Sequence, residues 1–517
     1  MVSMPNIFER AARLNPRSLC TRYEDREFTW LEAREQIARL AAGLGQFGLA
    51  AGERVGILSL NSDRYYQAIF AIPWADCTMV PLNTRWALPE NTYAVSDAGV
   101  RVILFDDAFA EQTQQLLGDV DCLEAAVYMG DGACPEWASS LTDLINQHDP
   151  AEMPEQDPND MAGIFYTGGT TGFPKGVMQS HRAIWASAVG ALPLMEMRRD
   201  SIYLHAAPMF HMADFAGSMG ATMSCASHVI VTAFEPGLVL DTIGSEGITN
   251  ALLVPAMIKM MLNHPNADDA DFSTLETIVY GASPMPAATL ETIMQKWPSV
   301  GLVQAYGQTE LAPVATMLAR SDHRAGSDKL KAAGQPTAVT EMRIVDEEGR
   351  DCSVGESGEI VVRGPHTMIG YWNKPEETAK ALQDGWVFTG DAGYLDEDGY
   401  LFIVDRVKDM VVTGGENVFT TEVENAMISH DAVQDVAVIG IPHEEWGEAV
   451  HAIVILQPGQ SATEQELMEH CRAQIAGYKL PKGITFREEP MPLSGAGKVL
   501  KTELRKPYWE GRERQVS

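Results

Sequence analysis

Tyr166-Thr-Gly-Gly-Thr-Thr-Gly-Phe-Pro-Lys-Gly-Val177 is the most informative stretch of this chain, because it gathers glycines, hydroxyls and one lysine within twelve residues. Glycines let backbone N–H groups approach phosphate oxygens closely, threonines add hydroxyl donors, and a lysine adds a point charge. The stretch therefore predicts a loop that wraps a polyphosphate. Its candidate phosphate ligands are Thr167, Gly168, Gly169, Thr170, Thr171, Gly172, Lys175 and Gly176.

The spacing of this loop differs from that of a Walker loop. The GxxxxGK[ST] pattern requires Ser or Thr directly after the lysine, whereas Gly176 follows Lys175 and Pro174 precedes it. A different nucleotide chemistry is indicated. Taken alone, a loop rich in Gly and Thr is also typical of a flexible surface turn.

Further motifs follow in a fixed order along the chain. They are Tyr306-Gly-Gln-Thr-Glu310, Thr389-Gly-Asp391, Asp405-Arg-Val-Lys-Asp409, Gly414-Gly-Glu-Asn417 and Gly495-Ala-Gly-Lys498. With the phosphate loop, this order and spacing resemble the acyl-CoA synthetase branch of the adenylate-forming enzymes, which also include luciferases and peptide-synthetase adenylation domains. The resemblance covers nearly the whole chain.

Composition restricts the partners. The chain has 71 acidic and 38 basic residues and a net charge of −33. Nucleic acids and anionic membranes both require positive surface, so neither is expected as a primary partner. If the substrates are ATP and CoA, as the resemblance implies, they must be attracted by local Lys and Arg, helix N-termini and Mg²⁺ against this field.

Length and cysteine usage indicate a multidomain protein of a reducing compartment. A chain of 517 residues predicts two or three domains. Its seven cysteines form no CxxC pair, so neither a zinc site nor a disulfide framework is expected. The N-terminus lacks a signal-peptide core, and no window approaches 18 apolar residues in a row. We expect a cytosolic protein without a transmembrane segment.

Hydrophobic patterning predicts an α/β fold. Residues 10–50 favour helix, with Thr29 as its cap. Short apolar runs alternate with helical patterns and predict parallel strands at 55–60, 102–105, 229–232, 251–254 and 277–280. Alternating strands and turns from 341 to 404 predict a β-rich subdomain. Beyond it, helix 421–430, strands 433–441 and 450–457, and helix 463–476 predict a small α+β domain.

The resemblance implies how these parts are organised. A large N-terminal domain of layered α/β subdomains plus the β-rich subdomain would occupy 1–405. A hinge at 406–409 with its pivot at Lys408 would connect it to a small, mobile α+β C-terminal domain at 410–517.

The resemblance also implies roles in ATP binding. The loop would hold the β and γ phosphates, chiefly through Thr170, Thr171 and Lys175. Family enzymes usually carry Ser where Gly168 stands, but Thr167 and Thr170 flank that position. Tyr306 would stack on adenine beside Gly307, and Thr309 would contact the α-phosphate. Asp391 and Arg406 would contact the ribose. The floor between adenine and substrate would be formed by Gly281, Ala282 and Ser283. Glu310 and Thr170 would hold Mg²⁺, which typically takes one or two carboxylates plus phosphate oxygens.

Two further sets of residues are implied for the two half-reactions. Lys498, on a loop with two glycines, would serve adenylation, although a lone lysine is most often a solvated surface residue. After rotation of the C-terminal domain, Gly414, Gly415 and Glu416 would line the thiol tunnel. Trp446 is a weaker candidate for a CoA contact, and a buried core tryptophan is an equal alternative.

The acyl pocket is least defined by the sequence. Pro208-Met-Phe-His-Met-Ala-Asp-Phe215 matches the gate region of the family, with His211 near the substrate carboxylate and Phe215 as a gating aromatic. Met209, Met212, Met219 and Met223 suit a deformable apolar cavity, and core packing would use them equally well.

We therefore expect an AMP-forming ligase that joins a small carboxylic acid to CoA, with a medium- to long-chain fatty acid as substrate. Aryl-propenoic acids and small branched or thioether acids remain open. So does an adenylating enzyme that loads a carrier protein, because amino-acid activators place an Asp after the gate motif and Asp214 lies there.

Other readings of the same fold are weaker. A regulatory protein without catalysis would lack a catalytic group, but Lys498, Glu310, Asp391 and Lys175 are all present. Oxidation of a luciferin-like adenylate is also compatible with this fold, because a fold alone does not determine the reaction. Homodimers are common in the family, so a homodimer is left open.

Overall fold

The computed structural model describes residues 2–167, 174–283, 285–406, 409–413, 416–443, 446–472, 474–493 and 499–510. The chain forms two compact units, here called unit 1 and unit 2. Unit 1 combines Met1–Met342 with Val362–Val387, and unit 2 combines Arg343–Val361 with Phe388–Ser517. The domain boundaries expected from the sequence divide the chain at other points. They stay a prediction, because compactness alone does not identify a hinge.

One sheet of unit 1 has the strand order β16-β15-β14-β13-β12-β10-β11-β1-β2. The strands from β14 to β1 in this order run parallel, whereas β2, β15 and β16 join antiparallel. The bounds are β1 Leu19–Tyr23, β2 Arg26–Thr29, β10 Ile202–His205, β11 Ser227–Ile230, β12 Asn250–Leu252, β13 Thr277–Gly281, β14 Gly301–Gly307, β15 Val314–Leu318 and β16 Gln335–Pro336.

A second sheet of unit 1 has the order β19-β9-β8-β4-β3-β5-β6-β7. It is parallel from β8 to β7, and β9 and β19 extend it antiparallel at one end. The bounds are β3 Arg54–Leu58, β4 Thr78–Pro81, β5 Val100–Phe105, β6 Ala125–Tyr128, β7 Ser139–Ser140, β8 Met161–Thr167, β9 Lys175–Ser180 and β19 Gly370–Tyr371.

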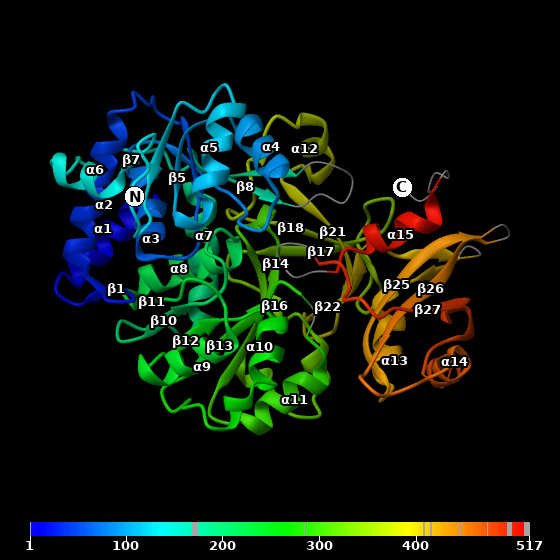
Figure 1. Ribbon diagram of the computed structural model, residues 1–517. Coiled ribbons are helices and arrows are strands. Elements are labelled where there is room, and N and C mark those ends of the chain that lie inside the picture. Colours follow the sequence, from blue (N-terminus) through cyan, green and yellow to red (C-terminus); the bar gives the residue numbers. More distant parts are fainter. Residues whose placement is uncertain are drawn as a thin grey trace. The chain divides into compact units, whose positions relative to one another are not determined.

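Helices cover both faces of each sheet, as parallel sheets require. Buried side chains of α1, α2, α3, α7 and α8 share one core with strands of both sheets. In contrast, α9, α10 and α11 pack on the first sheet, and α4 and α5 on the second (Figure 1). The bounds are α1 Met4–Leu14, α2 Trp30–Gly45, α3 Asp63–Trp74, α4 Leu88–Ala98, α5 Ala110–Asp119, α6 Leu141–Gln147, α7 His181–Met195, α8 Met212–Ser224, α9 Pro236–Ser245, α10 Pro255–Leu262, α11 Ala287–Lys296 and α12 Pro375–Ala381.

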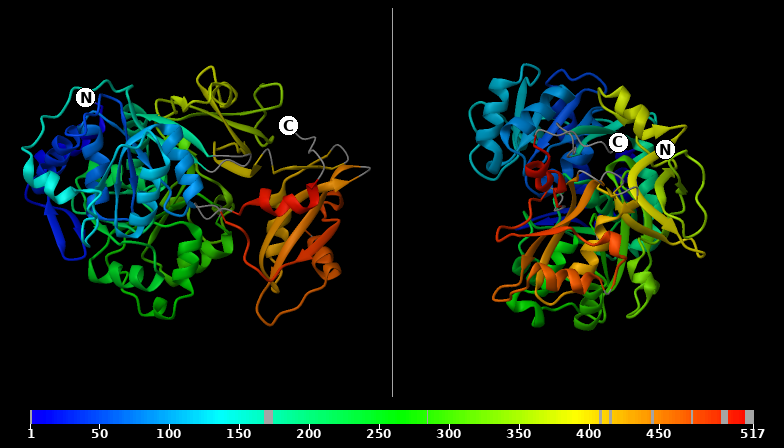
Figure 2. Two further views of the ribbon diagram at one scale, coloured as in Figure 1. Left: turned by 45° about the horizontal axis from the view of Figure 1, so that its top comes forward. Right: turned by 90° about the vertical axis from the view of Figure 1, so that its right-hand side faces the viewer.

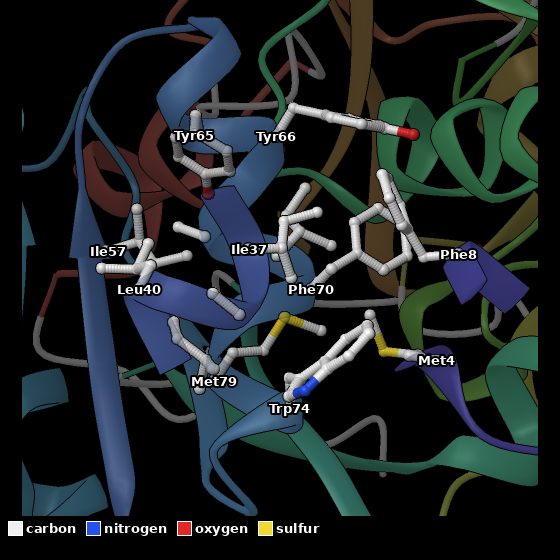
Figure 3. Close-up of a cluster of buried hydrophobic side chains, with 14 of the residues drawn as sticks. Met4, Phe8, Ile37, Leu40, Ile57, Tyr65, Tyr66, Phe70, Trp74 and Met79 are labelled. Atoms are coloured by element: carbon white, nitrogen blue, oxygen red, sulfur yellow. The ribbon is translucent and has the colours of Figure 1, made fainter. Parts of the chain in front are cut away.

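Aromatic rings dominate the core that joins the two sheets. Figure 3 shows Phe8 of α1 packed between Tyr66 and Phe70 of α3, with Trp74 and Met79 beside them. The ring centroids of Phe8 and Phe70 are 4.9 Å apart, and those of Phe8 and Tyr66 are 6.2 Å apart. Offset contacts of this kind stabilise a core beyond simple burial.

The predicted helix over 10–50 is wrong as a single element. The chain forms α1, then the β1–β2 hairpin, then α2. Glu24 adopts a φ of 53° at the hairpin turn, which a continuous helix would exclude. The predicted cap is confirmed, because the Thr29 side chain accepts from the Glu32 backbone N–H while the Glu32 carboxylate accepts from that of Thr29. The strands predicted near 55, 102, 229, 251 and 277 are confirmed as β3, β5, β11, β12 and β13.

The β-rich segment predicted after residue 341 is also confirmed. Its strands are ordered β17-β18-β21-β20, with β22 paired to β21. The bounds are β17 Glu341–Val345, β18 Gly358–Arg363, β20 Leu382–Gln383, β21 Trp386–Leu395 and β22 Leu401–Arg406.

The end of unit 2 is the predicted small α+β fold. Along β25, Val436 and Val438 pack against α13 and α14, whereas Ala437 and Ile439 face α15 (Figure 2). The bounds are β23 Val411–Thr413, β24 Glu416–Val418, α13 Thr420–Ile428, β25 Val433–His443, β26 Gly447–Leu456, α14 Glu464–Arg472, β27 Gly483–Phe486 and α15 Lys501–Trp509. The α/β class with a large N-terminal and a small C-terminal domain is thus confirmed.

The cysteines and the helices agree with two further expectations. All seven cysteines lie in the described residues, and none forms a disulfide. Among the helices that the structure describes, none has the length and apolar character needed to cross a membrane.

Buried histidines make the stability of unit 1 sensitive to acid. His181 and His366 are 2% and 0% exposed, and burial lowers the pKa of each to about 4. In the unfolded chain a histidine binds its proton near pH 6.5. Between these values the unfolded state binds more protons, so the free energy of unfolding falls as the pH drops.

We expect the free energy of unfolding to decrease from about pH 6.5 to about pH 4, with each such histidine contributing about 1.4 kcal/mol per pH unit. His366→Gln removes one titrating ring, so its slope should be shallower by about that amount. Urea denaturation at pH 7.5, 6.0 and 5.0 measures both slopes. Equal slopes in the parent and the variant would contradict this origin.

Candidate active site

The carboxyl edge of the first sheet brings together predicted segments that are far apart in the sequence. Because β10, β12, β13 and β14 run parallel, their carboxyl ends lie at one edge (Figure 1). The gate segment 208–211 follows β10. Gly281 ends β13 and leads into Ala282 and Ser283, and Tyr306–Glu310 ends β14 and continues past it. Ligands of open α/β sheets bind at this edge, so the topology assembles a candidate site there.

Two glycines permit the close packing at this edge. A Cβ on Gly281 would lie 2.1 Å from the carbonyl oxygen of Ala305, and one on Gly307 would lie 1.8 Å from that of Pro313. No side chain fits at those separations. The next residue, Ala282, has a φ of +66° and is therefore in the left-handed conformation. The segment predicted as the floor between adenine and substrate thus turns away from the strand at this residue.

The ends of the phosphate loop are held by a hairpin. Thr167 at the end of β8 pairs with Lys175 at the start of β9, and the Thr167 hydroxyl donates to the Lys175 carbonyl at 3.5 Å. Gly176 lies in the strand, where a Cβ would meet the Ile164 side chain at 2.6 Å. A glycine at position 176 therefore allows the two strands of the hairpin to pack closely. Both ends of the loop lie in unit 1 with β14.

Glu310 lies where the two sheets of unit 1 meet. The Tyr371 hydroxyl donates to Glu310 Oε1 at 2.7 Å, and the Met368 backbone N–H donates to the Glu310 carbonyl at 2.9 Å. The Gln179 side chain donates to the Thr309 carbonyl at 2.5 Å. Strands β9 and β19 thereby brace the turn that carries Thr309 and Glu310. The other oxygen of the Glu310 carboxylate accepts no hydrogen bond from the described residues.

The donor set of this turn fits a magnesium ion that is shared with phosphates. No group of three or more His, Cys, Asp or Glu suited to a metal occurs in the described part of the chain. A single half-buried carboxylate with one oxygen held and the other open suits Mg²⁺, which retains most of its waters and takes phosphate oxygens. Glu310 is therefore compatible with the role that the sequence assigned to it.

His211 is the N-cap residue of α8 and is half-buried. Its ring lies 4.2 Å from that of Phe210, and its backbone N–H donates to the Pro208 carbonyl at 3.1 Å. Phe215 is 1% exposed and packs edge-on against Phe165 at 5.2 Å. Met209, Met212 and Met219 are buried in the same core, which favours the packing interpretation of these methionines.

A buried polar chain supports α8 from below. Asp214 Oδ2 lies 2.7 Å from His205 Nδ1, and His205 Nε2 lies 2.9 Å from His228 Nδ1. The far nitrogen of His228 lies 3.0 Å from the Tyr66 hydroxyl, and the Tyr203 hydroxyl donates to Asp214 Oδ1 at 3.3 Å. All of these residues are 0% exposed, and burial lowers the pKa of His228 well below its ordinary value.

Both oxygens of Asp214 are thus engaged within the core. Asp214 presents no open carboxylate to the ammonium group of an amino acid. The one residue that favoured an amino-acid activator has a structural role instead, which the sequence did not reveal because its partners are on β10.

The remaining predicted ATP contacts lie in unit 2. Asp391 on β21 pairs across the ladder with Arg406 on β22 and is 8% exposed. Its neighbour Glu359 accepts from the Gly390 backbone N–H at 3.0 Å, and burial raises the pKa of Glu359. Side-chain contacts of Arg406 and Glu416 fall outside the description, as do Gly168, Gly169, Thr170, Thr171, Gly172, Lys408, Gly414, Gly415 and Lys498.

Trp446 is not a core residue. It is 37% exposed, its ring stacks on His443 at 4.1 Å and 6°, and Lys482 Nζ lies 4.9 Å from the ring centroid. An exposed aromatic face beside a cation can stack on a base and attract phosphate. This arrangement favours the predicted CoA contact over the core alternative.

Tyr371 is the site residue that sequence reasoning missed. Its partner Glu310 is 61 residues earlier in the chain, and the pairing depends on how β19 joins β9. The only signal in the sequence is the aromatic pair Tyr371-Trp372, which follows Met368-Ile369-Gly370 and precedes the polar stretch 373–380.

Comparison with known proteins agrees with this geometry. The family model for AMP-binding enzymes matches residues 8–372, and the model for the AMP-binding enzyme C-terminal domain matches residues 422–498. A feruloyl-CoA synthase from Amycolatopsis sp is 36% identical over 500 residues, covering 96% of this chain and 98% of the relative. A fatty acid–[acyl-carrier-protein] ligase of Streptomyces coeruleorubidus is 35% identical over 506 residues, covering 97% and 95%.

Among solved structures, an anthranilate CoA ligase in complex with anthranoyl-AMP superposes with a TM-score of 0.89 at 27% identity, covering 98% of this chain and 97% of that one. The chain therefore belongs to the family of AMP-binding enzymes, as an AMP-forming carboxylic acid–CoA ligase. The resemblance seen in the sequence motifs is confirmed. Ligases of this type use ATP and CoA.

The buried chain beneath α8 gives a testable result. Asp214→Ala leaves the Tyr203 hydroxyl and a ring nitrogen of His205 without their partner in the core, and each unsatisfied group costs about 1–3 kcal/mol. We expect the free energy of unfolding to fall by about 3 kcal/mol in urea denaturation. Asp200→Ala is the matched control, because Asp200 pairs with Arg198 on the surface, and such pairs contribute about 0–1 kcal/mol. Equal losses in both variants would contradict a satisfied buried network.

Proposed function

We propose that this enzyme activates a carboxylic acid that is uncharged and largely apolar beyond its carboxylate, with a medium- to long-chain fatty acid as the leading substrate class. The observation that carries the proposal is the set of segments at the carboxyl edge of the first sheet. There His211 precedes α8, which contributes the buried apolar side chains of Met212, Phe215 and Met219. The buried carboxylate of Asp214, on the same helix, is engaged by His205 and Tyr203. Such surroundings suit an acyl chain better than a charged group.

In the first half-reaction, a carboxylate oxygen attacks the α-phosphorus of ATP and the bond to diphosphate breaks. Lys175 and the loop hydroxyls would bind the β and γ phosphates, and Thr309 would orient the α-phosphate. Mg²⁺, held by Glu310 and Thr170, would offset the charge that grows on the phosphate oxygens. Lys498 would polarise the reacting phosphate. Positioning and charge stabilisation supply most of the catalysis in such transfers.

In the second half-reaction, the CoA sulfur attacks the carbonyl carbon of the acyl-adenylate, AMP leaves, and the thiol proton passes to solvent. Trp446 and Lys482 would contact CoA, and Gly414, Gly415 and Glu416 would line the path of the thiol after rotation about Lys408. The domain boundaries 1–405 and 410–517 belong to this proposal. A homodimer and a cytosolic location remain predictions.

A second substrate class is favoured by one comparison. The feruloyl-CoA synthase is 36% identical, so aryl-propenoic acids are the leading alternative. Transfer to a carrier protein is the second alternative, because the other relative is named for that acceptor.

A substrate panel distinguishes these classes. Diphosphate release is measured with straight-chain fatty acids, small branched and thioether acids, cinnamic-type acids and amino acids, each with CoA and with an acyl carrier protein. We expect CoA-dependent turnover on a band of fatty-acid lengths and none on amino acids. Turnover confined to cinnamic-type acids would contradict the fatty-acid proposal and favour an aryl-propenoic acid as the substrate. Turnover only with the acyl carrier protein would show that this protein, and not CoA, is the acyl acceptor.

The assignment of Lys498 is tested by separating the half-reactions. Lys498→Ala should reduce acid-dependent diphosphate release at least 100-fold, since loss of a transition-state charge contact costs about 10²–10³. Thioester formation from supplied acyl-AMP should persist. Lys506→Ala removes the same charge from an exposed position on α15 and should leave both half-reactions unchanged. Equal losses of the two half-reactions in Lys498→Ala would refute an adenylation-specific role.

A further inference from the structure

Tyr371 stands between two groups that the proposed function assigns to ATP. Its hydroxyl donates to Glu310 Oε1 at 2.7 Å, and Lys175 Nζ lies 5.0 Å from the centroid of its ring. Glu310 lies in the turn Thr309–Leu311 that follows β14, Lys175 starts β9, and Tyr371 belongs to β19. One aromatic side chain therefore contacts the predicted metal ligand with its edge and the predicted phosphate ligand with its face.

The backbone fixes the position of this tyrosine. Tyr371 pairs with Val177 of β9, and its N–H donates to the Thr378 hydroxyl at 2.9 Å. The following residue, Trp372, donates its N–H to the Gly176 carbonyl at 2.7 Å, directly beside Lys175. The backbone N–H of Met368, three residues before Tyr371, donates to the Glu310 carbonyl. The same short segment is thus attached to the loop hairpin and to the turn that carries the carboxylate.

The two opposite charges each contact Tyr371. Glu310 and Lys175 both belong to the described residues, and among these no ion pair joins the two. A direct pair would neutralise both groups before ATP arrived. A hydroxyl donor stabilises the carboxylate without cancelling its charge. An aromatic face within about 6 Å holds an ammonium group in the same way.

We propose that Tyr371 is a positioning residue that separates Glu310 from Lys175, leaving the carboxylate open to the metal ion and the ammonium open to the terminal phosphates of ATP. This inference rests on the proposed function, because it takes Glu310 and Lys175 as the metal and phosphate ligands. It adds a residue that acts through both of them without being assigned to ATP itself.

The test measures metal affinity and not turnover. Mn²⁺ serves as the probe, and its dissociation constant is obtained by electron paramagnetic resonance with α,β-methylene-ATP bound to the full chain. Tyr371→Phe removes the hydroxyl and keeps the ring. Loss of a hydrogen bond to a metal-ligating group typically weakens metal binding 10–100-fold. We expect at least a 10-fold rise in the Mn²⁺ dissociation constant and less than a 2-fold change in the metal-free affinity for the nucleotide analogue.

Tyr371→Leu separates the role of the ring from that of the hydroxyl. It removes the face under Lys175 as well, so the metal-free affinity for the analogue should also fall, by about 3-fold or more. The matched control is Tyr128→Phe, which removes a tyrosine hydroxyl that donates to the Asp107 carboxylate in the same unit. It should change neither constant.

A double variant makes the test independent of general loss of structure. If Tyr371 acts through Glu310, then adding Tyr371→Phe to Glu310→Gln should change the Mn²⁺ dissociation constant less than 2-fold further. Unchanged Mn²⁺ binding in Tyr371→Phe, or full additivity in the double variant, would overturn the inference alone. A parent protein that bound no Mn²⁺ with the analogue would overturn the proposed function, and the inference with it.

Discussion

The parallel register of β10, β12, β13 and β14 is the constraint on which the candidate site depends. It places segments from three parts of the chain at one edge of a sheet. The close approach of β13 to β14 requires a glycine at position 281, and that of β14 to the segment before β15 requires one at position 307. Helices on both faces exclude water from the strands, so the polar groups of the site gather where the strands end. A shift in register would move every one of these segments away from its partners.

Charge organises the site at short range and against the net charge of the whole molecule. The chain carries −33, yet Lys175 is held over an aromatic ring and a single half-buried carboxylate is braced by a tyrosine. Under the proposed function, these few opposed charges would receive a polyphosphate together with its metal ion. The buried chain from Asp214 to Tyr66 uses polar groups in a different way. Its side chains hydrogen-bond to one another inside the core and support α8, so they are not open to a ligand.

The sequence was sufficient for features that depend on neighbouring residues. The Thr29 cap and the strands β3, β5 and β13 follow from local patterns. The β1–β2 hairpin was missed because short strands beside helices give little periodicity over so few residues. Tyr371 and the engagement of Asp214 were missed for another reason. Each depends on a partner from a different element, which only the packed fold brings within hydrogen-bonding distance.

We expect the acid to pass through an acyl-adenylate. An acid labelled with ¹⁸O in its carboxylate provides the most direct test, because the attacking oxygen becomes bonded to the α-phosphorus and leaves with it. After turnover with ATP and CoA, mass spectrometry should find one labelled oxygen in AMP and none in diphosphate. Label in diphosphate or inorganic phosphate, or unlabelled AMP with full thioester formation, would contradict the account.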